Sequence, residues 1–158
     1  MSERSATHAT FALERVYPAP PARVYAAFAD PEQKARWSGC HDEWETLEQS
    51  MDFRVGGREV SRVGPAGGPV HGMEARYHDI VPGERIVYSY AMTVGEARIS
   101  VSLVTLEFEP AEGGTRLVFT EQGVFLDGHQ PAAEREAGTG TGLDRLRALL
   151  AEEMAVAV

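Results

Sequence analysis

The sequence has little cysteine, no long apolar run and no excess of basic charge. Its one cysteine, Cys40, permits no disulfide within the chain, which fits a reducing cytoplasm. No run approaches the ~20 apolar residues of a membrane-spanning helix, and the first residues lack the apolar core of a signal peptide. With 15 basic and 24 acidic residues, the formal net charge is −9. We therefore expect a cytoplasmic protein with no nucleic-acid partner and no membrane partner.

The length and composition are those of one globular domain. The chain has 158 residues, of which 43% are hydrophobic and 25% are charged. It contains no internal repeat and no low-complexity tract long enough to link two domains. We expect one compact core.

The first part of the chain predicts one strand and two short helices. Residues Thr10 to Tyr17 alternate with a period of two, as in a half-buried strand. Pro20 and Pro21 suit the first turn of a helix. Asp30 can cap a second helix over Pro31 to Arg36.

The middle of the chain predicts about six antiparallel strands. From about Trp44 to Gln122, short runs rich in Val, Ile, Tyr and Phe are separated by Gly and Pro turn signals. The clearest strands are expected over Arg85 to Thr93, Ile99 to Pro110 and Thr115 to Gln122. Short connections make successive strands antiparallel neighbours.

The C-terminal part predicts a long amphipathic helix. Its apolar stripe consists of Leu143, Leu146, Leu150 and Met154. The helix starts either at Thr141 or upstream around Glu134, and the sequence leaves both starts open. A curved sheet can wrap this helix and leave an apolar cleft beside it, an α+β architecture known as the helix-grip.

Five stretches resemble a known superfamily in their order and spacing. They are FALERVYPAPPARVYAAFADPEQKARW, MDFRVGGREV, ARYHDIVPGERIVYSY, GGTRLVFTEQGVFLDG and GLDRLRALLAEE. Together they resemble the START/Bet v-like (SRPBCC) superfamily, and within it bacterial proteins related to the C-terminal domain of the activator of heat-shock protein 90 ATPase. The resemblance covers about Thr10 to Glu153, the expected core of a single domain over residues 1–158.

This resemblance implies a fold more closely than a function. The implied fold is α+β, with six to seven curved antiparallel strands around a long C-terminal helix and two short helices after the first strand. The superfamily includes lipid and hormone carriers, aromatase/cyclases, resistance proteins and co-chaperones. One scaffold therefore supports several activities, and the function must be argued from the residues of the site.

The sequence predicts no catalytic residue, metal or cofactor. Cys40, His41 and Asp42 are adjacent, so in an extended segment their side chains point in opposite directions and form no relay. The five histidines are scattered, whereas zinc needs three or four converging ligands. The glycine-rich segment from Gly138 to Gly142 has no following lysine, so it is no phosphate loop; flexibility or close helix packing explains it better.

Glu121 is the most informative carboxylate. Glu107 alternates with apolar residues and should face solvent, whereas Glu121 shares the parity of Leu117 and Phe119 and should face the interior. A buried carboxylate needs a partner, and the candidates are Arg54, Arg58 and Arg76. Glu121 is thus a ligand contact, a member of a structural salt bridge, or part of an exposed rim.

Aromatic side chains supply the rest of the predicted site. We expect ten residues to line a cavity between the sheet and the C-terminal helix: Trp37, Trp44, Tyr77, Tyr88, Tyr90, Met92, Phe119, Glu121, Leu146 and Leu150. Tyrosine and tryptophan combine a large apolar body with one polar tip, which suits an aromatic ligand. Each single residue could instead simply fill the core.

The resulting hypothesis is non-catalytic binding of a small hydrophobic or aromatic molecule. One alternative is a protein-binding module, co-chaperone-like or regulatory, that uses the outer face of the sheet for a protein partner or a second copy of the chain. Another is an enzyme of the cyclase or hydrolase type that uses the same cavity. The enzyme requires a converging acid and base, which the sequence does not identify.

Overall fold

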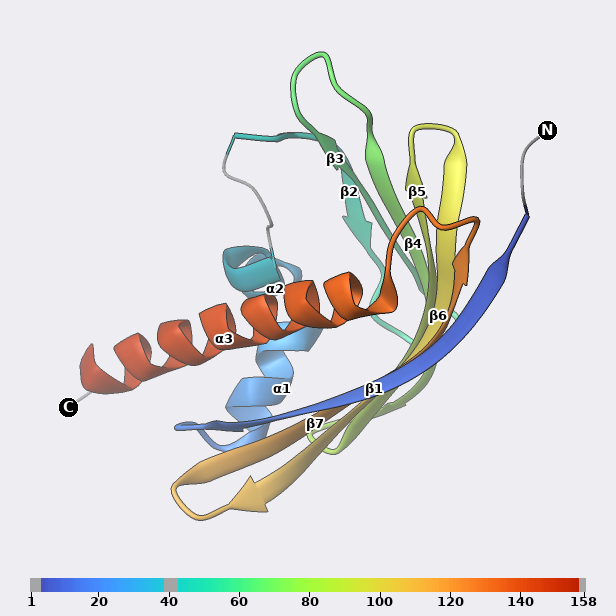
Figure 1. The fold of residues 1–158 in the computed structure, drawn as a ribbon. Coiled ribbons are helices and arrows are strands. Elements are labelled where there is room, and N and C mark those ends of the chain that lie inside the picture. The colour runs from blue at the N-terminus through green and yellow to red at the C-terminus, as the bar shows by residue number, and fades with distance from the viewer. Residues whose placement is uncertain (1–3, 39–42, 157–158) are drawn as a thin grey trace.

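The computed structural model describes residues 4–38 and 43–156. These residues form seven strands and three helices (Figure 1). In chain order they are β1 (Ala6–Tyr17), α1 (Pro21–Ala29), α2 (Pro31–Ser38), β2 (Glu45–Met51), β3 (Arg58–Gly64), β4 (His71–Val81), β5 (Arg85–Val94), β6 (Ala97–Ala111), β7 (Gly114–Leu126) and α3 (Ala132–Val156). The interpretation of Cys40, His41 and Asp42 lies outside the described residues.

The strands form one antiparallel sheet in the order β1-β7-β6-β5-β4-β3-β2. The strands β2 to β7 are a meander, and β1 joins it beside β7. The predicted α+β helix-grip fold is confirmed, including the two short helices after the first strand. β1 begins earlier than predicted because Ala6 to Ala9 pair with Gly123 to Leu126, beyond the predicted end of β7.

The sheet curves around its helices, as Figure 1 shows. α3 crosses the concave side and packs most closely against β1 and α2, while α1 packs against β6 and β7. The core lies where the concave face meets the three helices. It includes Tyr17, Val24, Phe28, Trp37, Ile86, Leu106, Phe108, Leu117, Phe119, Leu143, Leu146 and Leu150.

α3 begins at Ala132, so the upstream one of the two predicted starts is observed. The Thr141 hydroxyl does not cap the helix but donates to the carbonyl of Ala137 at 3.0 Å. Of two buried glycines inside α3, Gly140 is explained by close packing, whereas Gly142 has room for a Cβ in ordinary van der Waals contact. A Cβ at Gly140 would lie 3.1 Å from the guanidinium of Arg15, and one at Gly142 would lie 3.8 Å from the ring of Trp37.

Candidate functional site

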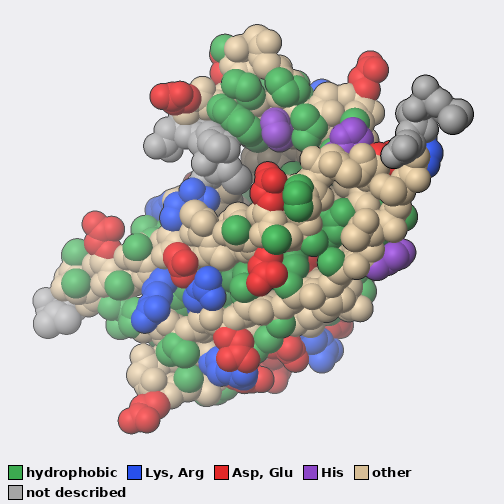
Figure 2. All heavy atoms as spheres, in the orientation of Figure 1, with side chains coloured by type: hydrophobic (Ala, Val, Ile, Leu, Met, Phe, Trp, Pro, Cys, Tyr) green, Lys and Arg blue, Asp and Glu red, His purple; other side chains and the backbone are tan. Residues whose placement is uncertain are grey.

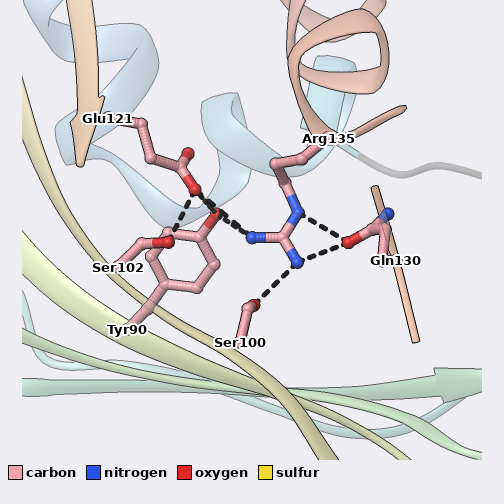
Figure 3. A network of polar contacts seen from close by, with 6 residues as sticks. All are labelled: Tyr90, Ser100, Ser102, Glu121, Gln130 and Arg135. Atoms are coloured by element: carbon pink, nitrogen blue, oxygen red, sulfur yellow. Dashed lines mark hydrogen bonds and ion pairs between the residues drawn. The ribbon is translucent and has the colours of Figure 1, made fainter. Parts of the chain in front are cut away.

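The centre of the site is Glu121, on the concave face of β7. Its side chain faces the interior, as the strand parity predicts, and the residue is only 1% exposed. Its Oε2 accepts hydrogen bonds from the hydroxyls of Tyr90 at 2.8 Å and Ser102 at 2.7 Å. The cation beside it is Arg135, whose Nη1 lies 3.3 Å from the same oxygen (Figure 3).

The predicted partners of Glu121 were wrong. Arg54 pairs with Asp52, Arg58 pairs with Glu74, and Arg76 lies on the exposed face of β4. The parity of β3 and β4 places Arg58 and Arg76 opposite each other on the outer face of the sheet. The actual partner is in the first turns of α3, the part of the helix whose existence the sequence left open.

Every nitrogen of the Arg135 guanidinium group makes a hydrogen bond, and Nη1 and Nη2 join α3 to the sheet. Nη1 donates to the Tyr90 hydroxyl at 2.9 Å and Nη2 donates to the Ser100 hydroxyl at 2.8 Å. Nε and Nη2 both donate to the side-chain oxygen of Gln130, at 3.1 and 2.6 Å. The guanidinium carbon also lies 5.6 Å from the ring centre of Tyr90 and 5.2 Å from that of Phe125. This cation is therefore fully engaged by the protein.

Glu121 keeps one oxygen without a partner. Its Oε1 is buried and accepts no hydrogen bond from the described residues. Figure 3 shows this oxygen turned away from the other five side chains of the network. A buried acceptor without a donor is unfavourable, and the charge of Glu121 is thus compensated on one side only.

A second buried carboxylate, Glu59 of β3, lies on the same face of the sheet. It is 4% exposed. Its Oε1 accepts hydrogen bonds from Lys34 of α2 at 2.6 Å and from the Tyr77 hydroxyl at 2.5 Å. Burial, followed by the charge of Glu59, raises the pKa of Tyr77. Each buried carboxylate is therefore paired with one cation and accepts a hydrogen bond from one tyrosine.

Tyr88 lies between the two tyrosines that bind these carboxylates. Its ring centre is 5.9 Å from that of Tyr77 and 6.0 Å from that of Tyr90. Its side chain is half-buried, and its hydroxyl makes no hydrogen bond with the described residues. Burial raises its pKa well above the ordinary value, and Tyr90, Glu121 and Glu59 raise it further. Tyr88 is thus a neutral phenol with free hydrogen-bonding capacity.

Five half-buried side chains on the inner face of β3 to β5 form what we call the concave patch. The register of β3, β4 and β5 places them on one face: Ser61, Met73, Tyr88, Tyr90 and Met92. α3 packs most closely on β1 and α2, and it contacts this patch through Arg135, which lies over the ring of Tyr90. Figure 2 shows the surface hollowed between α3 and the β3–β4 side of the sheet.

Nine of the ten predicted cavity residues divide into two groups, and Trp44 belongs to neither. Tyr77, Tyr88, Tyr90, Met92 and Glu121 lie in or beside the concave patch. By contrast, Trp37, Phe119, Leu146 and Leu150 are at most 8% exposed and belong to the core. Trp44 is half-buried, and its ring centre lies 4.5 Å from that of His71 at the start of β4.

Several residues of the site were missed at the level of sequence. Ser100 and Ser102 could have been found, because they continue the alternation of Val104 and Leu106 along β6. Glu59 could not have been found, because its burial depends on the pairing of β3 with β2 and β4. Arg135 gave no signal, because it precedes a glycine-rich segment of low helix propensity.

Two other hollows lie at opposite edges of the sheet. One, of about 600 Å³, is lined by the ends of β2 and β3 and includes Arg54 and Arg58. The other, of about 420 Å³, lies between α3 and β1 and includes Arg15 and Asp144. Arg54, Arg58 and Arg15 are paired with neighbouring carboxylates, as in the 2.7 Å contact of Arg15 with Asp144. Arg62, which also lines the first hollow, has no ion pair with the described residues. Neither hollow is lined by Tyr88 or Tyr90.

The histidines among the described residues form no metal-binding cluster. His78 makes a 2.7 Å hydrogen bond with Ser89, and His71 packs on Trp44. Within residues 4–38 and 43–156, no group of three or more His, Cys, Asp or Glu side chains is placed to hold a metal ion. No helix in the same two ranges is long and apolar enough to cross a membrane.

A curved seven-stranded sheet that grips a long C-terminal helix defines the class of this protein as the START/Bet v-like superfamily. Within it, the profile of the family described as "Activator of Hsp90 ATPase homolog 1-like protein" matches residues 18–151, and the chain belongs to this family. No curated protein matches the chain.

Solved structures of bacterial proteins share both sequence and fold with the chain. An uncharacterized protein from Rhizobium leguminosarum is 49% identical, with a TM-score of 0.89 over 96% of this chain and 99% of that one. A protein from Rhizobium loti is also 49% identical, with a TM-score of 0.85 over 91% and 98%. One from Chromobacterium violaceum is 32% identical, with a TM-score of 0.73 over 89% and 96%. These names state no activity, so the function must be argued from the site.

Proposed function

We propose that this protein binds a small hydrophobic or aromatic molecule against the concave patch, without catalysing its conversion. The observation that carries the proposal is the half-burial of Tyr88, Tyr90, Met73 and Met92 on one face of the sheet. Figure 2 shows the surface hollowed between α3 and the β3–β4 side of that sheet. Aromatic rings offer flat apolar contact, and methionine adapts to irregular shapes. The polar tips of the tyrosines can orient a ligand there.

The state of the two buried carboxylates favours binding over catalysis. A hydrolase or cyclase needs an acid and a base that converge on the reacting atoms. Glu121 is held by Tyr90, Ser102 and Arg135, and Glu59 is held by two donors of its own. Carboxylates fixed in this way stabilise the walls of a site rather than exchange protons with a ligand.

The proposed location is the cytoplasm, because the single cysteine fits a reducing compartment. The proposed partner is the small molecule itself. A protein partner, including a co-chaperone-like interaction or a second copy of the chain, would use the outer face of the sheet instead. Binding of a small apolar probe distinguishes the small-molecule proposal from the protein-partner alternatives.

The proposal predicts that filling the hollow abolishes binding. Titration with the fluorescent neutral probe N-phenylnaphthylamine should show saturable binding to the native protein. Met92→Trp places a large ring in the concave patch and should weaken this binding by at least about tenfold, or ~1.4 kcal/mol. Native mass spectrometry of protein from its own host should show a small-molecule adduct that the variant lacks.

The matched control is Val101→Trp, which adds the same ring to the outer face of the same sheet, where Val101 is 41% exposed. It should bind the probe as the native protein does. If the native protein binds no probe and carries no adduct, the carrier proposal is wrong and the protein-binding alternative takes its place. If both variants lose binding equally, the concave patch is not the binding site.

A further inference from the structure

The polar groups around the concave patch restrict the kind of ligand, and this inference rests on the proposed function. The first restriction concerns cations. Each nitrogen of Arg135 already donates to a protein acceptor, and Lys34 lies 2.6 Å from Glu59. A carboxylate or phosphate on the ligand would therefore find no cation free to bind it at these two pairs.

The second restriction concerns the local electrostatic field. Oε1 of Glu121 has no donor among the described residues, so this carboxylate is only partly compensated. Both Glu121 and Glu59 act on the Tyr88 hydroxyl, since each raises its pKa in addition to the effect of burial. A negative charge beside Tyr88 is therefore disfavoured, and the positive end of an O–H dipole is favoured.

The third restriction concerns hydrogen bonding. Two hydroxyls of the concave patch, those of Tyr88 and Ser61, have no partner among the described residues, and Tyr88 is the one that also offers an aromatic ring; the Tyr90 hydroxyl both accepts from Arg135 and donates to Glu121. A phenol hydroxyl can donate one hydrogen bond and accept others. A ligand that brings its own hydroxyl can satisfy Tyr88 and occupy the hollow at the same time.

We infer that the ligand is a neutral aromatic molecule with a hydroxyl group, whose ring lies against Tyr88 and Tyr90 and whose hydroxyl hydrogen-bonds to Tyr88. An aromatic ring next to these two side chains extends the row of ring contacts from Tyr77 to Tyr90. A cationic ligand is less suited, because each buried carboxylate already has a cation of its own. Tyr88 is thereby the residue that selects the ligand.

A set of four naphthalene probes of the same size tests this inference. They are naphthol, methoxynaphthalene, naphthoate and naphthylmethylamine, each substituted at the same ring position and titrated by calorimetry at neutral pH. The neutral hydroxyl compound should bind most tightly, with a preference of about 3- to 10-fold over the methoxy compound, which cannot donate. The anion and the cation should both bind more weakly than naphthol.

Two variants assign the preference to a single hydroxyl. Tyr88→Phe keeps the ring and should bind naphthol and methoxynaphthalene equally, because the hydrogen-bond partner is gone. Tyr25→Phe removes a hydroxyl from a half-buried tyrosine of α1, outside the concave patch, and should keep the preference of the native protein. Circular dichroism spectra should show that both variants are folded.

The possible results separate this inference from the proposed function. If all four probes bind equally, or if Tyr88→Phe keeps the preference for naphthol, the hydroxyl inference is wrong while binding in the hollow stands. Tightest binding of naphthoate or of naphthylmethylamine overturns it in favour of a charged ligand. If no probe binds the native protein, the proposed function itself fails.

Discussion

Arg135 compensates Glu121 and also connects two parts of the protein. It comes from α3, and its partners Tyr90, Ser100 and Glu121 come from three neighbouring strands. Both charged groups are nearly inaccessible, at 7% and 1% side-chain exposure. Such a pair adds little net stability compared with apolar residues, but the loss of one member leaves a buried charge.

Replacing Arg135 alone should therefore be strongly destabilising. We expect Arg135→Met to lower the free energy of unfolding by about 3–5 kcal/mol, measured by urea denaturation. The double variant Arg135→Met with Glu121→Leu should recover much of this loss, because it removes the unpaired charge as well. Arg116→Met is the control on the outer face and should change the midpoint little, because its partners Glu14 and Glu109 are exposed. A double variant no more stable than Arg135→Met would contradict this account.

The glycines of α3 show that tertiary contacts stabilise the first turns of this helix, whose start the sequence left open. Gly138 is exposed, and an added Cβ would meet nothing within 4 Å. Gly140 is buried, and an added Cβ would lie 3.1 Å from Arg15. Both reduce the intrinsic helix propensity of the segment, but only Gly140 is needed for close packing.

The two positions should respond differently to alanine. Gly138→Ala should raise the free energy of unfolding by about 0.5–1 kcal/mol, since it removes the conformational cost of glycine without a new clash. Gly140→Ala gains the same propensity, but Arg15 must move from its 2.7 Å contact with Asp144. Its melting temperature should therefore lie below that of Gly138→Ala. Equal stabilisation by both changes would show that the contact with Arg15 does not matter.

The difference between local and long-range contacts explains how much of the fold and of the site the sequence could predict. The period of two in β6 and β7 predicted the strands and the inward direction of Glu121, because strand parity is a local property. The Glu121–Arg135 pair could not be predicted, since it depends on where α3 begins and on how it crosses the sheet. Likewise, the burial of Glu59 follows from pairing between strands and from the position of Lys34 on α2, which are both long-range properties.

The strand meander was predictable because its turns are marked by local sequence signals. Turns with glycine at positive φ, such as Gly83 and Gly113, mark the connections between β4 and β5 and between β6 and β7. Curvature was predicted from the order of the elements and was also implied by the resemblance. The sequence did not predict which side chains would be buried in the core. Thus Leu146 and Leu150, predicted to line a cavity, are packed at 0% exposure, whereas Tyr88 and Tyr90 are left half-buried.

Across the protein as a whole, the buried tyrosines should make the fold sensitive to alkaline pH. Burial raises the pKa of Tyr17, Tyr77, Tyr88 and Tyr90 above the ordinary value near 10. The folded state therefore keeps these phenols protonated at a pH where the unfolded chain loses the protons. Their contribution to stability is complete below about pH 10 and is lost as the pH rises above it, because the unfolded state then binds fewer protons than the folded state.

Melting temperatures measured from neutral pH to above pH 10 should fall steeply at the alkaline end. The variant Tyr88→Phe should show a shallower fall, because it removes one of the raised pKa values, and it should match the native protein at neutral pH, where the hydroxyl has no partner to lose. Tyr17→Phe provides the contrast, since its hydroxyl donates to the carbonyl of Leu143 at 3.0 Å. That variant should be less stable at neutral pH by about 1 kcal/mol and should also show a shallower alkaline fall. An alkaline fall as steep in both variants as in the native protein would mean that groups other than these tyrosines control unfolding there.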